Sequence, residues 1–254
     1  MEKLGTSVPV SGRRCKVVCI KRNTADSVEI LLKDESGEPF VFKPGQFFMV
    51  NVEIDGQVVR RTYSATNAPG EFDGALRLGV KRRPGGLVSG YINDRLKVGD
   101  EVVVKGPGGK LVPTEGRGPR HLVLIAGGSG VTPMISMART LLASEPDTSI
   151  SLIYCNRCLD DVMFLQELNE LVDSNHDRFR VFHVLKENAE GWSACAGRLN
   201  VDILRDILNG LPAVDEYLVC GTPEMMTGVC GYLAELGVPA SVIRTETFNV
   251  PEDI

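Results

Sequence analysis

A glycine-rich loop in the middle of the chain has the composition of a phosphate-binding loop. Its sequence is Ala126-Gly127-Gly128-Ser129-Gly130-Val131-Thr132-Pro133, between a strand-like and a helix-like segment. Glycines allow a sharp turn that brings backbone N–H groups close to a phosphate, and a helix N-terminus adds partial positive charge. Pro133 suits the first helical turn, where an N–H would have no acceptor. The loop predicts a nucleotide site; a tight turn without a ligand is the alternative.

A second motif, Arg61-Thr62-Tyr63-Ser64, ends a strand-like segment in the first half of the chain. An arginine can hold a phosphate through two N–H donors, and a tyrosine ring can lie against a flat ring system. Taken alone, the motif favours the simpler interpretation of a surface arginine next to a strand tyrosine.

Two more motifs lie where an anion or a nucleotide could bind. Gly85-Gly86-Leu87-Val88-Ser89 opens a short helical pattern and offers N–H groups and a hydroxyl at a helix N-terminus, with capping alone as the alternative. Cys220-Gly221-Thr222-Pro223-Glu224-Met225-Met226 follows a strand-like segment. The carboxyl ends of parallel strands are where open α/β sheets bind ligands.

The elements that position the first-half motifs are short strands separated by glycine and proline turns. Segments rich in β-branched residues or alternating in polarity are Arg14–Arg22, Ser27–Lys33, Gln46–Val52, Val58–Ser64, Ala75–Val80 and Glu101–Lys105. One helix is expected at Gly86–Leu96, where apolar residues can share a face. Six short strands at this spacing predict a small antiparallel β-barrel.

The second half alternates strands and helices, which predicts a parallel α/β sheet. A polar linker rich in glycine and proline, residues 114–119, separates the halves, and we place the domain boundary between residues 114 and 115. The strands expected are His121–Ala126, Ser149–Cys155, Phe179–Leu185, Glu216–Cys220 and Ala240–Glu246. The helices expected are Thr132–Ala143, Asp160–Val172, Val201–Leu208 and Pro223–Leu236.

The composition fits a soluble globular protein and argues against other classes. The 254 residues are 43% hydrophobic and 24% charged, with a net charge of −5 and no basic stripe typical of nucleic-acid binding. No apolar run is long enough to span a bilayer, and the N-terminus lacks a signal-peptide pattern. Seven cysteines, an odd number, do not indicate a disulfide framework. We expect a reduced, cytoplasmic protein with no domain before the first strand.

Together the four motifs, in this order, resemble those of the ferredoxin–NADP reductase superfamily. The shared signatures are Arg-x-Tyr-Ser, Gly-Gly-x-x-Ser, Gly-Gly-x-Gly-x-Thr-Pro and Cys-Gly-x-Pro, and the resemblance extends from about residue 13 to residue 248. The subgroup looks most like the reductases of oxygenases, flavohaemoglobins and cytochrome b5. The resemblance implies an antiparallel barrel that binds a flavin, followed by an α/β domain that binds NAD(P)H.

For the flavin, the resemblance implies that Arg61 holds the pyrophosphate, that Tyr63 lies against the isoalloxazine, and that Ser64 sits near N5. Gly86 to Ser89 would cradle the same pyrophosphate. The implied flavin-binding set is Arg61, Thr62, Tyr63, Ser64, Val80, Gly86, Leu87, Val88, Ser89 and Phe248.

For the nicotinamide nucleotide, the resemblance implies the loop from Gly127 to Pro133, with Thr132 near the nicotinamide and Cys220 near its C4. The implied set is Gly127, Gly128, Gly130, Thr132, Pro133, Arg157, Cys220 and Gly221. Glu246 and Phe248 resemble an ending whose aromatic ring covers the flavin. The residues implied for the reaction itself are Ser64, Cys220, Glu246 and Phe248.

The expected cofactor is FAD, with FMN as the alternative, and no metal site is expected. NADH is preferred over NADPH because Asp160 and Asp161 would repel a 2′-phosphate, although Arg157 could bind one. The protein would pass hydride from NADH to the flavin and then single electrons to an iron–sulfur or haem protein. A free-flavin reductase and a flavin-bearing subunit of a larger complex are the alternatives, as is a binding module without flavin.

Overall fold

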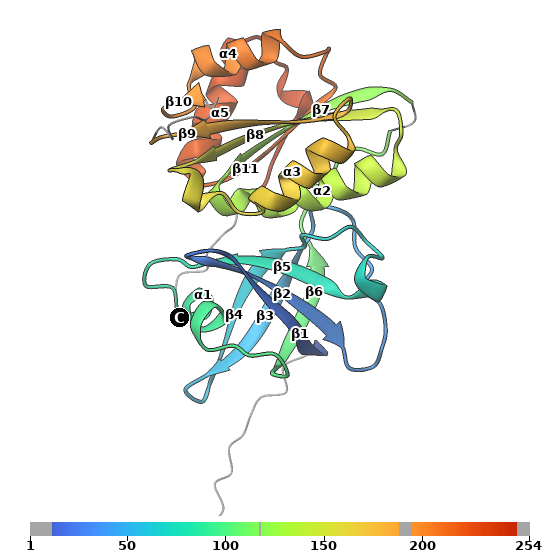
Figure 1. The fold of residues 1–254 in the computed structure, drawn as a ribbon, viewed down its shortest axis with the longest axis vertical. Coiled ribbons are helices and arrows are strands. Elements are labelled where there is room, and N and C mark those ends of the chain that lie inside the picture. Colours follow the sequence, from blue (N-terminus) through green and yellow to red (C-terminus); the bar gives the residue numbers. More distant parts are fainter. Residues whose placement is uncertain (1–11, 117, 188–194, 248–254) are drawn as a thin grey trace, which may run out of the picture.

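The computed structural model describes residues 12–116, 118–187 and 195–247, which form two domains, one above the other in Figure 1. The first is an antiparallel sheet curved into a barrel. Its strands are β1 (Arg13–Thr24), β2 (Ser27–Asp34), β3 (Phe47–Ile54), β4 (Gln57–Ser64), β5 (Leu76–Lys81) and β6 (Glu101–Gly108). All six expected strands are present, within a few residues of the expected ends.

The barrel sheet is not closed along its whole length. Its strand order is β4-β3-β6-β1-β2-β5, so β4 and β5 are the two edges. They meet through one isolated bridge between Ala65 and Leu78. Helix α1 (Leu87–Asp94) lies beside the opening and bonds to β5, since the Asn93 side chain donates to the Val80 carbonyl at 3.2 Å. Along β4, Arg61, Thr62 and Tyr63 are partly exposed at this opening, whereas Ser64 is buried.

The second domain is a six-stranded parallel sheet with helices on both faces. The strands are β7 (Arg120–Gly127), β8 (Thr148–Asn156), β9 (Phe179–Leu185), β10 (Cys195–Ala196), β11 (Glu216–Cys220) and β12 (Ile243–Thr245), in the order β10-β9-β8-β7-β11-β12. The chain moves outward from β7 to β10 and then returns to β11 on the other side of β7. This reversal leaves a crevice at the carboxyl ends of β7 and β11, where such sheets bind ligands.

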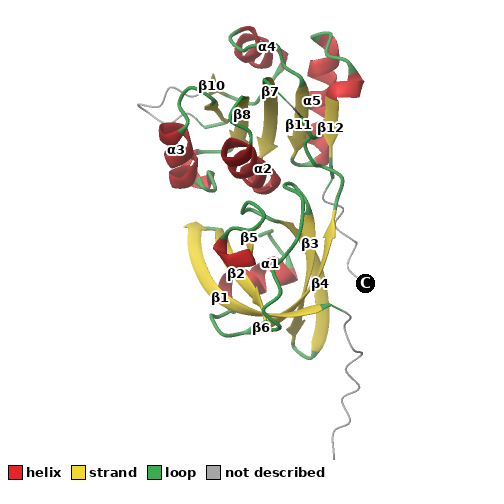
Figure 2. Cartoon of the chain, turned by 90° about the vertical axis from the view of Figure 1, so that its right-hand side faces the viewer, coloured by secondary structure: helices red, strands yellow, loops and turns green. Residues whose placement is uncertain are grey.

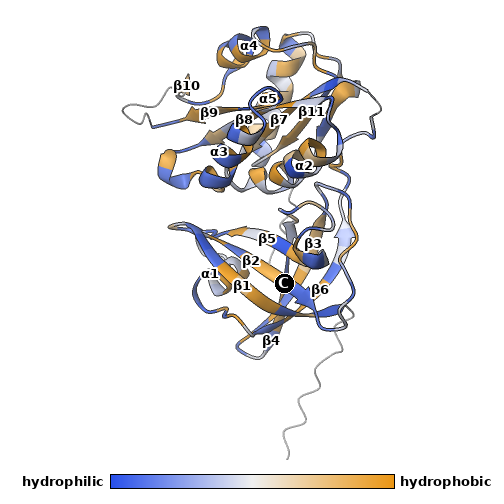
Figure 3. Ribbon diagram, turned by 45° about the vertical axis from the view of Figure 1, so that its right-hand side comes forward, coloured by the Kyte–Doolittle hydropathy of each residue, from blue (hydrophilic) through white to orange (hydrophobic). Residues whose placement is uncertain are grey.

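Two pairs of helices cover the parallel sheet, and apolar residues follow its central strands (Figure 3). Helices α2 (Val131–Ser144) and α3 (Leu165–Ser174) pack on one face, with Met134 and Leu168 in that core. Helices α4 (Val201–Asn209) and α5 (Pro223–Glu235) pack on the other, with Leu204 and Val229 buried. Figures 1 and 2 show α2 and α3 between the sheet and the barrel.

The element boundaries differ from the sequence predictions at three places in the second domain. The helix expected from Asp160 begins at Leu165, because residues 159–161 form a 3₁₀ turn and Phe164 adopts a left-handed conformation with φ 61°. The last strand is shorter than expected, since residues 240–242 form a 3₁₀ turn after Pro239. The two-residue strand β10 was not expected.

The domains meet through close packing of α2 on the barrel. The hydroxyl of Ser136 donates to the Asn67 carbonyl at 2.7 Å. A Cβ atom at Gly45 would lie 2.4 Å from the Met137 methyl group, so the barrel loop approaches α2 closely only because residue 45 is glycine.

Candidate active site

The Arg61-to-Ser64 motif lies on the open edge strand of the barrel. Tyr63 pairs with Phe48 across β3 and packs against the barrel core, and burial raises the pKa of its hydroxyl. The guanidinium of Arg61 donates to the Arg60 carbonyl at 2.8 Å. Thr62 pairs with Met49. Because side chains alternate along a strand, the Thr62 side chain lies on the opposite face of β4 from those of Arg61 and Tyr63. The motif thus directs Arg61 and Tyr63 to one face of the edge strand.

The hydroxyl of Ser64 is buried without a hydrogen-bond partner among the described residues, and the residue is only 1% exposed. An unpaired buried hydroxyl costs free energy, and such groups usually have a partner. The observation fits a ligand that bonds to Ser64 at the barrel edge. A ring nitrogen or carbonyl of a cofactor is chemically suited to bond to such a hydroxyl.

The second barrel motif forms the N-terminus of α1. Gly86 is the residue before the helix, and no side chain caps the first turn. The Ser89 hydroxyl accepts from the Arg83 N–H at 3.0 Å and donates to the Gly86 carbonyl at 3.3 Å, so it fixes the loop itself. The N–H groups of Leu87, Val88 and Ser89 have no acceptor within the helix. They can bind a phosphate, as the sequence predicts, through the backbone.

Two of the predicted flavin residues have buried side chains. Val80 is fully buried in the barrel core, and Val88 is 1% exposed in the same core. The structure gives the side chains of both residues a packing role. Leu87, in contrast, is 52% exposed at the start of α1.

The glycine loop at the end of β7 has the close contacts that its sequence predicts. A Cβ atom at Gly130 would lie 2.2 Å from the Cys220 carbonyl oxygen, and one at Gly127 would lie 2.2 Å from the Met225 sulfur. Gly128 has φ +52°. The loop can therefore pass beside the end of β11 only with glycine at these positions, which brings the glycine loop and the Cys220-to-Met226 motif together in one crevice.

Thr132 and Pro133 are buried at the start of α2. The Thr132 hydroxyl donates to the Ser129 carbonyl at 2.9 Å, and its methyl group would lie 3.0 Å from a Cβ atom at Gly79 of the barrel. Thr132 therefore lies at the contact between the domains, next to β5. A nicotinamide at this position would face the barrel.

Tyr154 is a buried residue of the site that the sequence analysis missed. Its hydroxyl donates to the Gly128 carbonyl at 3.1 Å and accepts from the Met163 N–H at 3.2 Å, and burial raises its pKa. It thereby ties the glycine loop to the segment before α3. A tyrosine inside a strand has no sequence signal that separates this role from ordinary packing.

A cleft of about 680 Å³ runs along the carboxyl end of the parallel sheet and is called here the nucleotide cleft. It contains the predicted residues Gly127, Gly128 and Arg157, together with cationic side chains that lie outside the sequence motifs. Its lining residues are Lys81, Gly127, Gly128, Cys155, Asn156, Arg157, Asp161, Val184, Lys186, Gly197, Arg198, Leu199, Thr222, Glu224, Met225, Gly228, Val229 and Tyr232. Lys186 and Arg198 each follow the end of a strand, and this position in the sequence is the feature that could have identified them as residues of the cleft.

The nucleotide cleft receives residues from both domains. Lys81 ends β5 of the barrel, and its ammonium group lies 3.5 Å from Asp26. Arg157 pairs with Asp161, whose carboxylate lies 3.0 Å from its Nε atom. The Arg157 charge is thus already partly compensated, whereas Lys186 and Arg198 add positive charge suited to a pyrophosphate.

Cys220 and Glu246 lie at the barrel side of the crevice. Cys220 is fully buried, and burial, assisted by Glu246, raises the pKa of its thiol to about 12. The thiol is therefore neutral and not poised as a nucleophile. The Glu246 carboxylate accepts from the Lys110 N–H of the barrel at 2.6 Å, so it joins the two domains. Phe248 lies outside the described residues.

Two models of oxidoreductase domains together match most of the chain. An "Oxidoreductase FAD-binding domain" matches residues 16–112, and an "Oxidoreductase NAD-binding domain" matches residues 124–231. The chain belongs to the ferredoxin–NADP reductase superfamily. It is an NAD(P)H-dependent flavoprotein reductase, built from a flavin domain and a nucleotide domain.

Curated relatives of this reductase are named for different enzyme systems. NADH-cytochrome b5 reductase 1 of Cryptococcus neoformans is 37% identical over 207 residues, which cover 77% of this chain and 68% of the relative. A component of the 1,2-phenylacetyl-CoA epoxidase of Escherichia coli is 31% identical over 244 residues, covering 92% of this chain and 67% of that protein.

Among solved structures, the flavohaem-like FAD/NAD-binding domain of the Vibrio cholerae nitric oxide dioxygenase superposes with a TM-score of 0.82. It is 26% identical, and the match covers 93% of this reductase and 98% of that domain. The two-domain arrangement predicted from the sequence is confirmed by this likeness.

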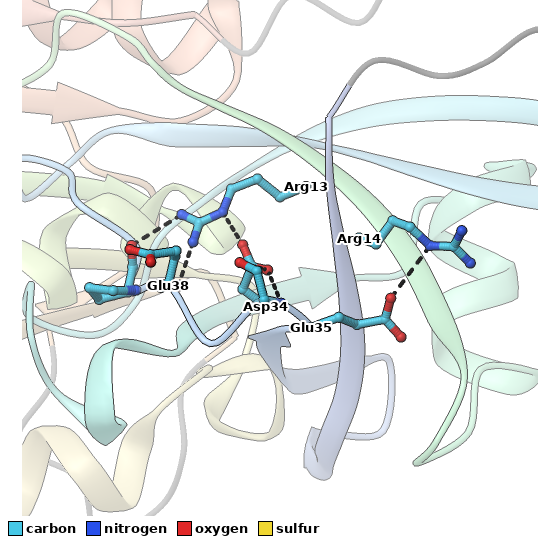
Figure 4. A pocket seen from close by; sticks show the side chains of 7 residues that line it. Arg13, Arg14, Asp34, Glu35 and Glu38 are labelled. Atoms are coloured by element: carbon cyan, nitrogen blue, oxygen red, sulfur yellow. Dashed lines mark hydrogen bonds and ion pairs between the residues drawn. The ribbon is translucent and has the colours of Figure 1, made fainter.

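Within the described ranges, no group of three or more histidine, cysteine or acidic residues is placed to hold a metal ion. In the same part of the chain, no helix is long and apolar enough to cross a membrane. A hollow at the start of β1 contains Arg13 and Arg14, but Arg13 is paired with Asp34 and Arg14 with Glu35 (Figure 4). Each arginine of this hollow thus has a carboxylate partner.

Proposed function

We propose that this reductase binds FAD on the barrel edge and NADH in the nucleotide cleft, and passes electrons singly to a haem or iron–sulfur protein. The observation that carries the proposal is the unpaired, buried hydroxyl of Ser64, next to Tyr63 on the edge strand β4. That placement gives a flavin ring both a surface and a hydrogen-bond partner.

The residues of this chain would bind and orient the two cofactors and would not themselves react. Arg61 and the N–H groups at the start of α1 would hold the flavin pyrophosphate, and Tyr63 and Ser64 would fix its ring. Bound FAD supplies the chemistry, since it takes two electrons as hydride and gives them up one at a time. Thr132, Gly221 and the buried Cys220 would shape the nicotinamide side and exclude water. FMN remains the alternative cofactor, and chromatography of the flavin released by heat distinguishes the two.

NADH is favoured over NADPH by the Arg157–Asp161 pair. A 2′-phosphate placed near Arg157 would also meet the Asp161 carboxylate, which lies 3.0 Å from the guanidinium. A phosphate bonded to the same guanidinium would be repelled by this carboxylate, so the phosphate gains little from the arginine. Comparison of kcat/KM for NADH and NADPH tests this preference.

The acceptor is proposed from the names of the relatives. The curated relative from Cryptococcus neoformans is named for a haem protein, cytochrome b5, and the Escherichia coli relative is a component of an epoxidase. Both names support an acceptor that is a separate protein or a partner within a complex. A free-flavin reductase is the second candidate.

Steady-state turnover separates the two candidates. An electron-transfer reductase oxidises NADH rapidly with ferricyanide, slowly with oxygen, and reduces cytochrome c well only with an added partner protein. Strong, saturable turnover with free riboflavin or FMN, and none with ferricyanide, would instead identify a flavin reductase.

A further inference from the structure

Five charged side chains form a continuous network where α3 and α2 meet the barrel, and we call it the charge network. Glu29, Glu71 and Arg77 come from the barrel, and Arg139 and Glu167 come from the nucleotide domain. Arg77 donates two parallel hydrogen bonds to Glu167, at 3.0 and 2.9 Å. Arg139 bonds to both Glu167 and Glu71. The network therefore crosses between the domains twice, through the Arg77–Glu167 pair and through the Arg139–Glu71 pair.

The centre of the charge network is shielded from water. The side chain of Arg77 is 11% exposed, that of Glu29 is 8% exposed and that of Glu167 is 17% exposed. Arg77 also donates to the Thr66 carbonyl at 2.7 Å and to the Thr66 hydroxyl at 3.0 Å. Thr66 lies two residues after Ser64 in the chain. The guanidinium therefore links the segment that ends the flavin motif to helix α3.

A second contact fixes the beginning of α3 on the same side of the barrel. The Asn23 side chain accepts from the Phe164 N–H at 2.7 Å. Phe164 has φ 61°, and its ring would lie 2.8 Å from a Cβ atom at Gly79. The first turn of α3, which carries Glu167, is therefore held by both its backbone and its side chain.

Such a network favours one arrangement of the domains over all others. Paired arginine and carboxylate groups are directional, and shielded charges are costly when a small displacement leaves them unpaired. An apolar contact of the same area tolerates sliding, because dispersion and burial are not directional. None of the five network residues is among the described residues that line the nucleotide cleft.

We propose that Arg77 and Glu167 are positioning residues, which hold the nucleotide domain in the orientation that brings a bound nicotinamide against the flavin face of the barrel. The proposal rests on the proposed function. Transfer of hydride between stacked rings depends steeply on their separation, so a slight rotation at the network slows the reaction without touching either cofactor.

The variant Glu167→Gln tests the proposal, because it keeps the shape of the side chain but removes the charge shared by Arg77 and Arg139. We expect the rate of flavin reduction at saturating NADH to fall about 10-fold or more. Flavin content and the Kd for NADH should stay within about two-fold. The control is Arg205→Gln, which breaks an exposed ion pair with Asp202 inside α4 and should leave the rate unchanged.

Hydrogen–deuterium exchange supplies a readout that does not depend on activity. In Glu167→Gln, peptides from β5 and α3 should exchange faster, while peptides from α4 should not. Arg77→Lys, which retains the charge and loses the paired hydrogen bonds, should give an intermediate rate of flavin reduction and serves if Glu167→Gln does not fold. A stabilising role alone would lower the melting temperature and leave the rate of flavin reduction as it is.

The proposal is overturned if both variants reduce their flavin at the wild-type rate. It is also overturned if exchange at β5 and α3 is unchanged while the rate falls. A wild-type protein that binds no flavin, or is not reduced by NADH, would refute the proposed function instead, and exchange at the domain contact would still report whether the network holds the domains.

Discussion

The thiol of Cys220, at the end of β11, donates to the backbone carbonyl of Glu246 with 3.8 Å between sulfur and oxygen. The side chain of the same Glu246 accepts from the Lys110 N–H in the barrel. The end of β11 is thereby joined to the barrel through one residue, Glu246, and the buried Cys220 thiol takes part in that connection.

We predict that Cys220→Ala slows flavin reduction and leaves flavin content unchanged. Loss of the thiol opens space beside Gly221 and removes the contact with Glu246, so the nicotinamide ring is held less firmly. A decrease of about 10-fold, equivalent to about 1.4 kcal/mol in the barrier, is expected. Stopped-flow bleaching of the flavin by NADH measures it, and a wild-type rate would refute this role for Cys220.

Arg61→Ala should weaken flavin binding by about 1.5–3 kcal/mol, the usual contribution of a hydrogen bond to a charged group. Arg60→Ala is the matched control, because Arg60 is the exposed neighbour on the same strand. Flavin retention after dilution is measured by fluorescence. Full occupancy in Arg61→Ala would show that the phosphate is held elsewhere.

Ser64→Ala should have opposite effects on the empty and the flavin-bound protein. In the empty protein the variant removes a buried hydroxyl that lacks a described partner, so its stability should stay the same or rise by about 1 kcal/mol. The increase in melting temperature on adding FAD should be smaller than in the wild type. An equal increase in both proteins would mean that the flavin does not bond to Ser64.

Asp161→Asn should increase the use of NADPH. The substitution releases Arg157 from its partner and removes a negative charge from the nucleotide cleft. We expect kcat/KM for NADPH to rise about 10-fold, with that for NADH changed less than about two-fold. Asp160→Asn serves as the control, because Asp160 is exposed and does not line the cleft. An equal effect of the two substitutions would contradict the assignment.

His183 should make the protein less stable in mild acid. Burial lowers its pKa from 6.5 to about 4, so the unfolded chain binds a proton more tightly than the folded one. The free energy of unfolding is therefore unaffected by His183 protonation above pH 6.5. It decreases as the pH falls toward 4, by roughly 2–3 kcal/mol. Urea unfolding at pH 7.5 and 4.5 measures the difference, which should be smaller in His183→Gln. An unchanged difference would refute the contribution.

Local chemistry made much of the site predictable. Glycine at positions 127 and 130 is required by contacts with Met225 and Cys220, and the sequence shows it as a glycine loop after a strand. The alternation of apolar residues placed all six barrel strands. Long-range contacts leave no such trace, so Lys81 could not be placed in the nucleotide cleft, nor Arg77 opposite Glu167, 90 positions away.

Val80 shows what the position of a residue in a strand adds to its position in the sequence. Its strand ends near the predicted site, but the two-residue alternation of β5 turns its side chain into the barrel core, where it is fully buried. A contact between Val80 and a cofactor would therefore be made by its backbone, and this binding role stays a prediction.

The opening in the barrel has a further consequence for handling the protein. Strands β4 and β5 are both edges joined by a single described bridge, so each has backbone donors and acceptors with no neighbouring strand. Exposed edges of this kind are templates for pairing with another chain, which leads to aggregation. A flavin lying across β4 would shield one of them. Preparations stripped of cofactor should therefore precipitate more readily than yellow ones, and solubility would report occupancy before any assay is run.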